Sequence, residues 1–262
     1  MRAKTNGIET NYEIHGRAGA DWLVFSHSLA CSARMWDPQI AAFADRYRIL
    51  AYDTRGHGAS DAPPGPYTLE MLADDLKALL DHLGIASAHY CGLSMGGMIG
   101  QTFALRYPGV FRTLTLADTT SRYPAEAWPV WAERIRIAET RGMEPLAQPT
   151  LERWFTAAFR EKNPAAVNAI RRLIVATPIA GYVGCCHAIP KINLTARLKE
   201  IRCPTLVIVG AEDPGTPPVM AREIHENLPG STLVEIPAAA HLANLEQPEA
   251  FNRALGDFLA RH

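Results

Sequence analysis

Residues 88–97 read AHYCGLSMGG and join a short apolar run to a segment with helical periodicity. At their centre, Gly92, Ser94 and Gly96 form the pattern G-x-S-x-G. In a tight strand-to-helix turn this pattern holds the serine exposed in a strained backbone conformation, and small flanking residues let backbone segments approach closely. The positive end of the helix dipole then faces the place where an oxyanion forms. The stretch predicts that Ser94 is a nucleophile, since it lacks the lysine and the glycine spacing of phosphate-binding turns.

Short apolar runs alternate with helical patterns along most of the chain, which is typical of β-α-β units around a mainly parallel sheet. Thr68 is a good N-cap for the leucine-rich run that follows it at helical spacing. The sequence therefore predicts an α/β fold. The expected strands cover residues 7–15, 22–26, 48–52, 88–91, 111–116, 205–209 and 231–236, and the expected helices cover residues 69–83, 95–107 and 247–261.

Residues 121–200 break this alternation, because they are helical in pattern, contain seven prolines and lack a convincing strand. We expect them to form a helical cap inserted into a core domain made of residues 1–120 and 201–262. The cap also differs in charge, since nine Arg and three Lys against seven Glu and no Asp give it a net charge of +5. The whole chain has a net charge of −1, so the core domain carries −6.

Composition limits the class of protein. The 262 residues are 48% hydrophobic and 20% charged, which fits a globular protein and excludes extended disorder. A net charge of −1 argues against a nucleic-acid partner, because such binding needs an excess of Lys and Arg. No apolar run approaches the ~18 residues of a membrane span, and no signal-like apolar region follows the N-terminus. We therefore expect no membrane partner and a cytoplasmic location.

The cysteines are odd in number and show no C-x-x-C spacing, so the sequence predicts neither a disulfide framework nor a metal site. The adjacent Cys185 and Cys186 are candidates for redox chemistry. A bridge between neighbouring residues is strained, however, and small buried thiols are the simpler expectation.

A nucleophilic serine needs a base, and the base needs a carboxylate to orient it. Among nine histidines, His241 is distinctive because it follows the last expected strand in a loop, at the sheet edge where Ser94 is expected. Asp213 ends the preceding strand on the same edge, and serine, aspartate, histidine is a known chain order for such a triad. Asp118, at the end of another strand, and the adjacent Glu212 remain rivals for the acid.

With these residues the sequence resembles the α/β-hydrolase superfamily over nearly its whole length. Three stretches carry this resemblance: the G-x-S-x-G turn around Ser94, GAEDPGTP at 210–217 and AHLANLEQP at 240–248. More narrowly, the sequence is similar to the 3-oxoadipate enol-lactonases of aromatic degradation. The narrower resemblance rests on MWDPQ at 35–39, YDTRGHGAS at 52–60, PPGPY at 63–67, CGLSMGGMIGQ at 91–101, RWF at 153–155, ATP at 176–178 and GYVGCC at 181–186.

The resemblance implies an α/β-hydrolase fold with a mostly parallel eight-stranded sheet, flanking helices and an inserted cap. It implies that the backbone N–H groups of Leu29 and Met95 form an oxyanion hole. It also implies a serine hydrolase that opens a small carboxylate-bearing enol-lactone through an acyl-enzyme, with no cofactor and no metal. The cap charge of +5 would steer such an anionic lactone or ester inward. Expected substrate contacts are the carboxylate-binding residues Arg34, Arg153 and Arg160 and the apolar walls Trp128 and Trp154.

One stretch departs from the lactonase pattern. Those enzymes usually read SNSLG after the first buried strand, whereas residues 26–30 here read SHSLA. His27 is similar to the H-G dipeptide of general esterases, which keeps a broad-specificity carboxylesterase of small esters as the alternative function. A ligand sensor that keeps the triad but turns over slowly and a cofactor-free perhydrolase are further alternatives. The sequence makes no prediction of oligomeric state.

Overall fold

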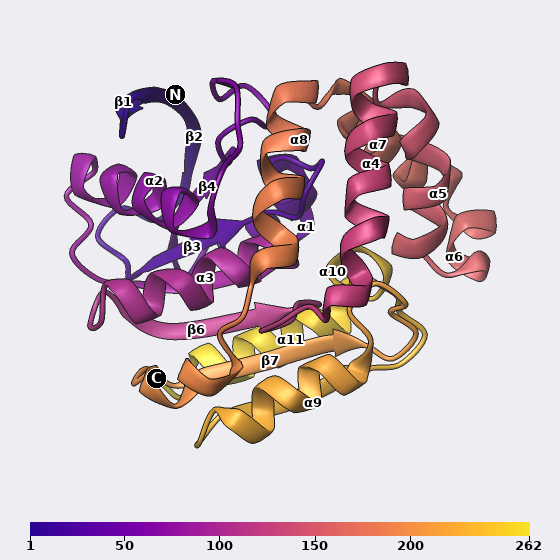
Figure 1. Cartoon of the computed structure of the whole chain (residues 1–262). Coiled ribbons are helices and arrows are strands. Elements are labelled where there is room, and N and C mark those ends of the chain that lie inside the picture. The colour runs from indigo at the N-terminus through magenta and orange to yellow at the C-terminus, as the bar shows by residue number, and fades with distance from the viewer.

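The computed structural model describes all 262 residues, and an eight-stranded sheet lies at its centre (Figure 1). The strand order is β1-β2-β4-β3-β5-β6-β7-β8. β2 is antiparallel to both of its neighbours, and every other pair is parallel, so the predicted mostly parallel sheet is confirmed. The strands are β1 (Arg2–Thr5), β2 (Ile8–Gly16), β3 (Trp22–Ser26), β4 (Arg48–Tyr52), β5 (Ala88–Leu93), β6 (Phe111–Ala117), β7 (Thr205–Gly210) and β8 (Thr232–Ile236).

Helices cover both faces of this sheet (Figure 1). α2, α3 and α9 lie on one face, and α1 packs with α11 on the other. The central strands β3, β5 and β7 are buried on both sides, which explains why they are continuous apolar runs. The bounds of the helices that flank the sheet are α1 (Asp37–Phe43), α2 (Leu69–His82), α3 (Met95–Arg106), α9 (Pro218–Asn227) and α11 (Pro248–Leu259), with the short α10 (Ala243–Glu246) before the last.

Every expected strand and helix is present, with ends that differ by at most two residues. The hydroxyl of Thr68 accepts a hydrogen bond from the Met71 N–H at 3.1 Å, which confirms the predicted start of α2. β1 has no separate signal in the sequence, because only Ala3 and Thr5 of this short strand are buried. β1 is held in place by its antiparallel pairing with β2.

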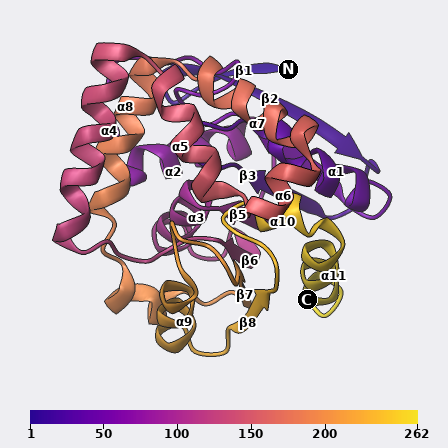
Figure 2. The same ribbon diagram turned by 90° about the vertical axis from the view of Figure 1, so that its right-hand side faces the viewer.

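Five α-helices follow β6 and precede β7, and they cover the edge of the sheet at which the parallel strands end (Figures 1 and 2). Three of the seven prolines, Pro129, Pro145 and Pro164, lie in the first turn of an α-helix, where a missing N–H breaks no hydrogen bond. This arrangement supports the proposal that residues 121–200 form a cap on a core of residues 1–120 and 201–262. The cap helices are α4 (Trp128–Arg141), α5 (Glu144–Trp154), α6 (Ala157–Lys162), α7 (Pro164–Ala176) and α8 (Ile179–Ala188).

Glycines allow α8 to pack directly on the core. A Cβ on Gly181 would lie 2.0 Å from the carbonyl oxygen of Gly56, which is far inside van der Waals contact. A Cβ on Gly184 would lie 2.7 Å from the ring of Tyr67. The glycines of the GYVGCC stretch are therefore explained by the close approach of the cap to the core.

The chain has no disulfide. Cys185 and Cys186 are free and buried, and burial raises the pKa of Cys186 to about 12. A thiol with so high a pKa is poorly reactive near neutral pH. Both side chains fill space between α8 and its neighbours, in line with the expectation of small buried thiols.

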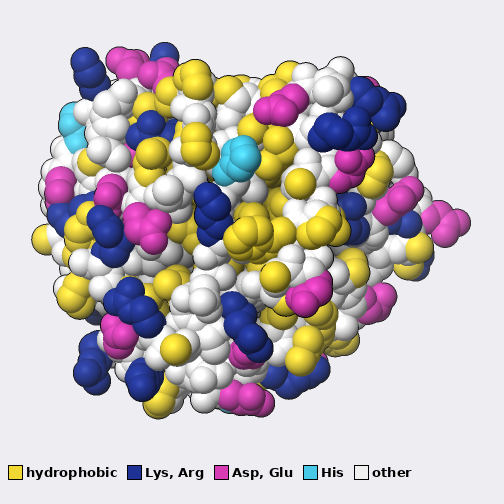
Figure 3. All heavy atoms as spheres, in the orientation of Figure 1, with side chains coloured by type: hydrophobic (Ala, Val, Ile, Leu, Met, Phe, Trp, Pro, Cys, Tyr) yellow, Lys and Arg dark blue, Asp and Glu magenta, His cyan; other side chains and the backbone are white.

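Basic and acidic side chains are interspersed over the face that Figure 3 shows, and apolar side chains gather near its middle. No uniformly basic surface is present on this face. No single helix has both the length and the apolar character needed to cross a membrane. The bent pair Pro164–Ala176 and Ile179–Lys191 meets that criterion only when the two helices are taken together.

We expect Gly181→Ala to lower the free energy of unfolding by about 1–3 kcal/mol, because the new Cβ meets backbone atoms that cannot move aside. Gly256→Ala in α11 is the matched control, since its Cβ would make ordinary contact at 3.5 Å with the Phe43 ring. Alanine is the better helix former by about 1 kcal/mol, so this control should be neutral or stabilising. Urea unfolding measures both, and equal effects would contradict the packing argument.

Buried histidines should make stability depend on pH. Burial is the largest cause of the lowered pKa of His57, to about 3, of His89, to about 4, and of His27. Between these values and about 6.5 the unfolded chain binds more protons, so the free energy of unfolding decreases as the pH falls through this window. Urea midpoints measured near pH 7 and near pH 4.5 should show this loss. His89→Leu should lose less over the same interval, and an unchanged pH dependence would argue against the mechanism.

Candidate active site

Ser94 occupies the sharp turn between β5 and α3. Its backbone angles, φ 57° and ψ −113°, are rare for a residue other than glycine. Two close approaches impose this conformation. A Cβ on Gly92 would lie 2.4 Å from the carbonyl group of Gly96, and a Cβ on Gly96 would lie 2.2 Å from the Ser26 carbonyl oxygen. Ser94 precedes the first residue of α3, yet its hydroxyl makes no capping hydrogen bond, and the residue is only half-buried. The hydroxyl therefore remains available to a ligand.

His241 and Asp213 meet between the loops that follow β8 and β7. Nδ1 of His241 lies 2.8 Å from Oδ2 of Asp213, and both residues are buried. Asp213 also accepts hydrogen bonds from the Thr216 hydroxyl at 2.7 Å and from the Gly215 N–H at 2.7 Å. Burial acts to raise the pKa of Asp213, but His241 and the Thr216 donors outweigh it, so the pKa is lowered. An ionised Asp213 holds the proton of His241 on Nδ1 and leaves Nε2 free to accept one.

The two rival carboxyl groups do not contact His241. Oδ1 of Asp118 accepts a hydrogen bond from the Gly210 N–H at 2.7 Å, and its Oδ2 has no partner. Burial, and then repulsion by Asp213, raise the pKa of Asp118 well above its ordinary range. Glu212 is exposed to solvent. Of the three carboxyl groups, the structure brings only Asp213 to the imidazole.

Two backbone N–H groups are available near Ser94 to hold an oxyanion. The N–H of Leu29 makes no hydrogen bond, and Leu29 lines the same cavity as Ser94. Met95 is the first residue of α3, and the first N–H groups of a helix have no partner within it. The two residues expected to form an oxyanion hole therefore both offer a free donor.

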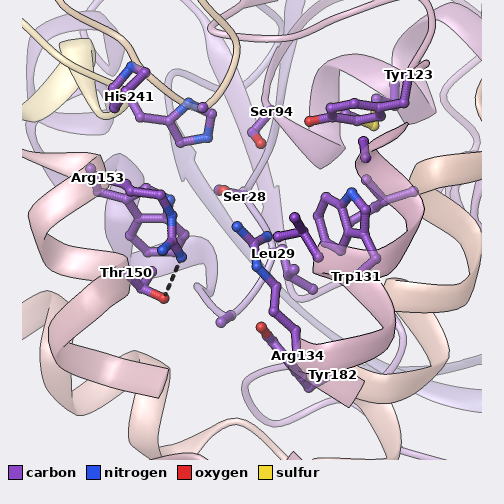
Figure 4. A pocket seen from close by; sticks show the side chains of 18 residues that line it. Ser28, Leu29, Ser94, Tyr123, Trp131, Arg134, Thr150, Arg153, Tyr182 and His241 are labelled. Carbon is purple, nitrogen blue, oxygen red and sulfur yellow. Dashed lines mark hydrogen bonds between the residues drawn. The ribbon is translucent and has the colours of Figure 1, made fainter. Parts of the chain in front are cut away.

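Ser94 and His241 face a cavity of about 300 Å³ (Figure 4). One wall is the loop after β3, which contributes Ser28–Ala30, and the opposite walls come from the cap helices α4, α5 and α8. A volume of this size suits a small organic molecule. No group of three or more His, Cys, Asp or Glu side chains gathers as metal ligands.

Two guanidinium groups reach this cavity from the cap, Arg134 from α4 and Arg153 from α5 (Figure 4). Neither Arg134 nor Arg153 forms a salt bridge, although four other arginines of the cap do. The guanidinium carbon of Arg134 lies 4.5 Å from the Trp131 ring centroid, and Arg153 donates a hydrogen bond to the Thr150 hydroxyl at 3.2 Å. Burial, and then repulsion by Arg134, lower the pKa of Arg153 to about 10. Two half-buried cations without a carboxylate partner favour the binding of an anion.

The structure divides the five residues expected to contact substrate. Arg153 and Trp154 line the cavity. Arg34, Arg160 and Trp128 lie outside its lining, so the geometry gives no support to their expected role. The side chain of Arg34 is 58% exposed and pairs with carboxylates of the core, Arg160 donates to a backbone carbonyl of the cap, and Trp128 is 52% exposed.

Arg134 is the residue that the sequence analysis misses. It lies three residues after Trp131 and four residues before Ala138, the two buried residues of α4. It therefore occupies the buried face of an amphipathic helix, where an unpaired charge is rare. That position was the signal available in the sequence, but it appears only once the helix bounds and the buried face are known.

The cap contacts the loop that carries His241. The Trp154 ring stacks on the imidazole with centroids 6.1 Å apart, and the Trp154 carbonyl accepts a hydrogen bond from the Leu242 N–H at 3.1 Å. Glu246 accepts hydrogen bonds from the N–H and the hydroxyl of Thr156, each at 2.9 Å, and from the residue before His241 at 3.2 Å. These contacts tie the end of α5 to the histidine loop.

Comparison with known proteins agrees with this architecture. The sequence matches the alpha/beta hydrolase fold family over residues 21–248. Together with the eight-stranded sheet and the serine at the strand-to-helix turn, the match shows that the chain belongs to the α/β hydrolase fold family. It is an enzyme of that family.

Within the family the chain is similar to 3-oxoadipate enol-lactonases. It is 40% identical to 3-oxoadipate enol-lactonase 2 of Acinetobacter baylyi, over 97% of this chain and 94% of that protein. The crystal structure of the enol-lactonase from Burkholderia xenovorans LB400 superposes with a TM-score of 0.96 at 40% identity, covering 99% of this chain and 100% of that one. The structure of a thermophilic esterase from Thermogutta terrifontis, solved with malate bound, superposes with a TM-score of 0.94 at 30% identity. It covers 100% of this chain and 98% of that one.

We expect Asp213→Asn to lower kcat for p-nitrophenyl acetate by about 10³- to 10⁴-fold, because an amide leaves the imidazole in the wrong tautomer. Glu212→Gln, an exposed neighbour on the same loop, is the matched control and should retain the kcat of the unmodified enzyme. Asp118→Asn should cause a much smaller loss than Asp213→Asn. If Asp118→Asn proved the more damaging of the two, the assignment of the acid would be wrong.

Proposed function

We propose that the protein is a serine hydrolase that opens a small, carboxylate-bearing enol-lactone through an acyl-enzyme. The observation that carries the substrate class is the pair Arg134 and Arg153, which reach the cavity of Ser94 without a carboxylate partner. A neutral ligand would leave both charges uncompensated in a partly desolvated space. A substrate carboxylate neutralises them and orients the ring. The similarity to 3-oxoadipate enol-lactonases supports the same class.

In the first step, Oγ of Ser94 attacks the lactone carbonyl carbon while Nε2 of His241 accepts the hydroxyl proton. Asp213 stabilises the imidazolium that forms. The N–H groups of Leu29 and Met95 hold the oxyanion, and each donor of this kind contributes about 3 kcal/mol. The tetrahedral intermediate then collapses, the ring C–O bond breaks, and His241 returns the proton to the leaving oxygen.

In the second step, His241 takes a proton from water, and the resulting hydroxide attacks the acyl carbon. Ser94 leaves with that proton, and the product is the open-chain acid. The leaving oxygen stays tethered to the acyl group, so water competes with reclosure of the ring. An enol oxygen is a weak base, which makes ring opening easy and favours the forward reaction.

The departure at His27 does not change the walls of the cavity. His27 is fully buried and does not line the space in front of Ser94. The residue that favoured a broad carboxylesterase therefore acts behind the site and makes no contact with a bound ligand. Specificity is set by the cap residues, which supports the anionic lactone over small neutral esters.

The test compares an enol-lactone that bears a carboxylate with p-nitrophenyl acetate, which is neutral. Arg134→Gln and Arg153→Gln should each raise KM for the lactone by about 10- to 100-fold, the loss expected for a charged hydrogen bond. KM for the neutral ester should hardly change. Ser94→Ala should abolish both reactions.

Arg160→Gln in the cap and Arg34→Gln in the core are matched controls, because both arginines lie outside the cavity. They should leave KM for the lactone unchanged. A higher kcat/KM for the neutral ester than for any carboxylated lactone would instead establish the carboxylesterase.

A further inference from the structure

We propose that His27 and His57 are positioning residues that hold the oxyanion loop, residues 26–31, so that the Leu29 N–H points into the cavity. This inference rests on the proposed serine-hydrolase mechanism. Both imidazoles are fully buried, and neither lines the cavity. Their ring centroids lie 5.2 Å apart. They therefore act through the loop and not on the substrate.

His27 orients the peptide that carries the Leu29 N–H. Nδ1 of His27 lies 2.7 Å from the Ser28 carbonyl oxygen, and Nε2 accepts a hydrogen bond from the Thr54 N–H at 2.9 Å. A backbone N–H only donates, so Nε2 is unprotonated and Nδ1 donates to Ser28. The Ser28 carbonyl and the Leu29 N–H belong to one planar trans peptide and point in opposite directions. Anchoring the carbonyl therefore fixes the direction of the N–H, and it also polarises that donor.

His57 holds the next peptide in the same way. Its Nε2 accepts a hydrogen bond from the Ala30 N–H at 3.0 Å, and its Nδ1 lies 3.2 Å from the Arg55 carbonyl oxygen. Ala30 has φ 57°, a conformation that a residue with a side chain keeps only when its surroundings impose it. His57 contributes that restraint. Both peptide planes that flank the Leu29 Cα are thus fixed by an imidazole.

Both roles require a neutral ring, because a proton on Nε2 would face a backbone N–H. Burial is the largest cause of the lowered pKa of both histidines, which for His57 falls to about 3. The rings therefore stay neutral under ordinary assay conditions. Each remains an acceptor at Nε2 and a donor at Nδ1 throughout the reaction.

Two amide substitutions separate a positioning role from simple filling of space. The amide group of asparagine reaches the place of Nδ1 in histidine, and that of glutamine reaches the place of Nε2. His27→Asn keeps the donor to Ser28, whereas His27→Gln loses it. At the other ring the order reverses, since His57→Gln keeps the acceptor for Ala30 and His57→Asn loses it.

We expect kcat for p-nitrophenyl acetate to fall about 10- to 100-fold in His27→Gln and His57→Asn, while KM stays within about threefold. His27→Asn and His57→Gln should keep kcat within about threefold of the unmodified enzyme. The affinity for phenylboronic acid, whose tetrahedral serine adduct places an oxygen in the oxyanion hole, should fall in parallel with kcat. Melting temperatures of all four variants report the stability lost with each imidazole.

His89 provides the matched control. It is buried at the amino end of β5 and lies 2.9 Å from the Thr113 hydroxyl, away from the oxyanion loop. His89→Asn and His89→Gln should lower the melting temperature and leave kcat unchanged.

The proposal is overturned if the two amides at each position lose the same kcat, if the loss lies in KM alone, or if boronate affinity stays constant while kcat falls. Asparagine should retain kcat at position 27, whereas glutamine should retain it at position 57. Either position alone therefore tests the proposal if variants at the other do not fold. Ester turnover that survives Ser94→Ala would instead overturn the proposed mechanism. Turnover of esters but not of lactones would overturn only the proposed substrate.

Discussion

The close approach between the start of α3 and the end of β3 is the constraint on which the site depends. Gly96 lies against the Ser26 carbonyl so tightly that no side chain fits between them. The contact brings the helix N-terminus, with its free N–H groups, beside the loop that follows β3. Together with the approach of Gly92 to Gly96, it holds Ser94 in its strained turn. One backbone contact thus positions Ser94 and both proposed oxyanion donors.

Core and cap contribute different things to the cavity. The core supplies a serine, an imidazole and a carboxylate from three loops at one edge of the sheet, where the parallel strands end. The cap supplies positive charge and apolar walls, and it is anchored at both sides. Glycines of α8 pack on the core, while Trp154 stacks on His241 and Thr156 donates hydrogen bonds to Glu246 of α10. The position of His241 therefore depends on the cap as well as on the sheet.

Local patterns in the sequence account for most of the fold and for the proposed triad. The strands and helices of the core follow from runs of apolar residues, and Thr68 marks the start of α2. Ser94, Asp213 and His241 follow from a turn motif and from their places after strands. These signals lie within single segments of the sequence, or they need only the rule that the carboxyl ends of parallel strands lie at the same edge of the sheet. Substrate contacts are less local, and of the five expected only Arg153 and Trp154 reach the cavity.

The sequence by itself determined the α/β class and a helical segment with a net charge of +5, and it named candidates for nucleophile, base and acid. Each of these depends on periodicity, on glycine spacing or on residue type along a single element. Only the tertiary structure decided which carboxyl group meets the imidazole, that Arg134 enters the cavity and that Arg34 does not. The physical reason is that these outcomes depend on distances between loops and helices far apart in the chain. Neighbouring positions of a helix point in different directions, so one side chain faces the cavity while the next faces solvent.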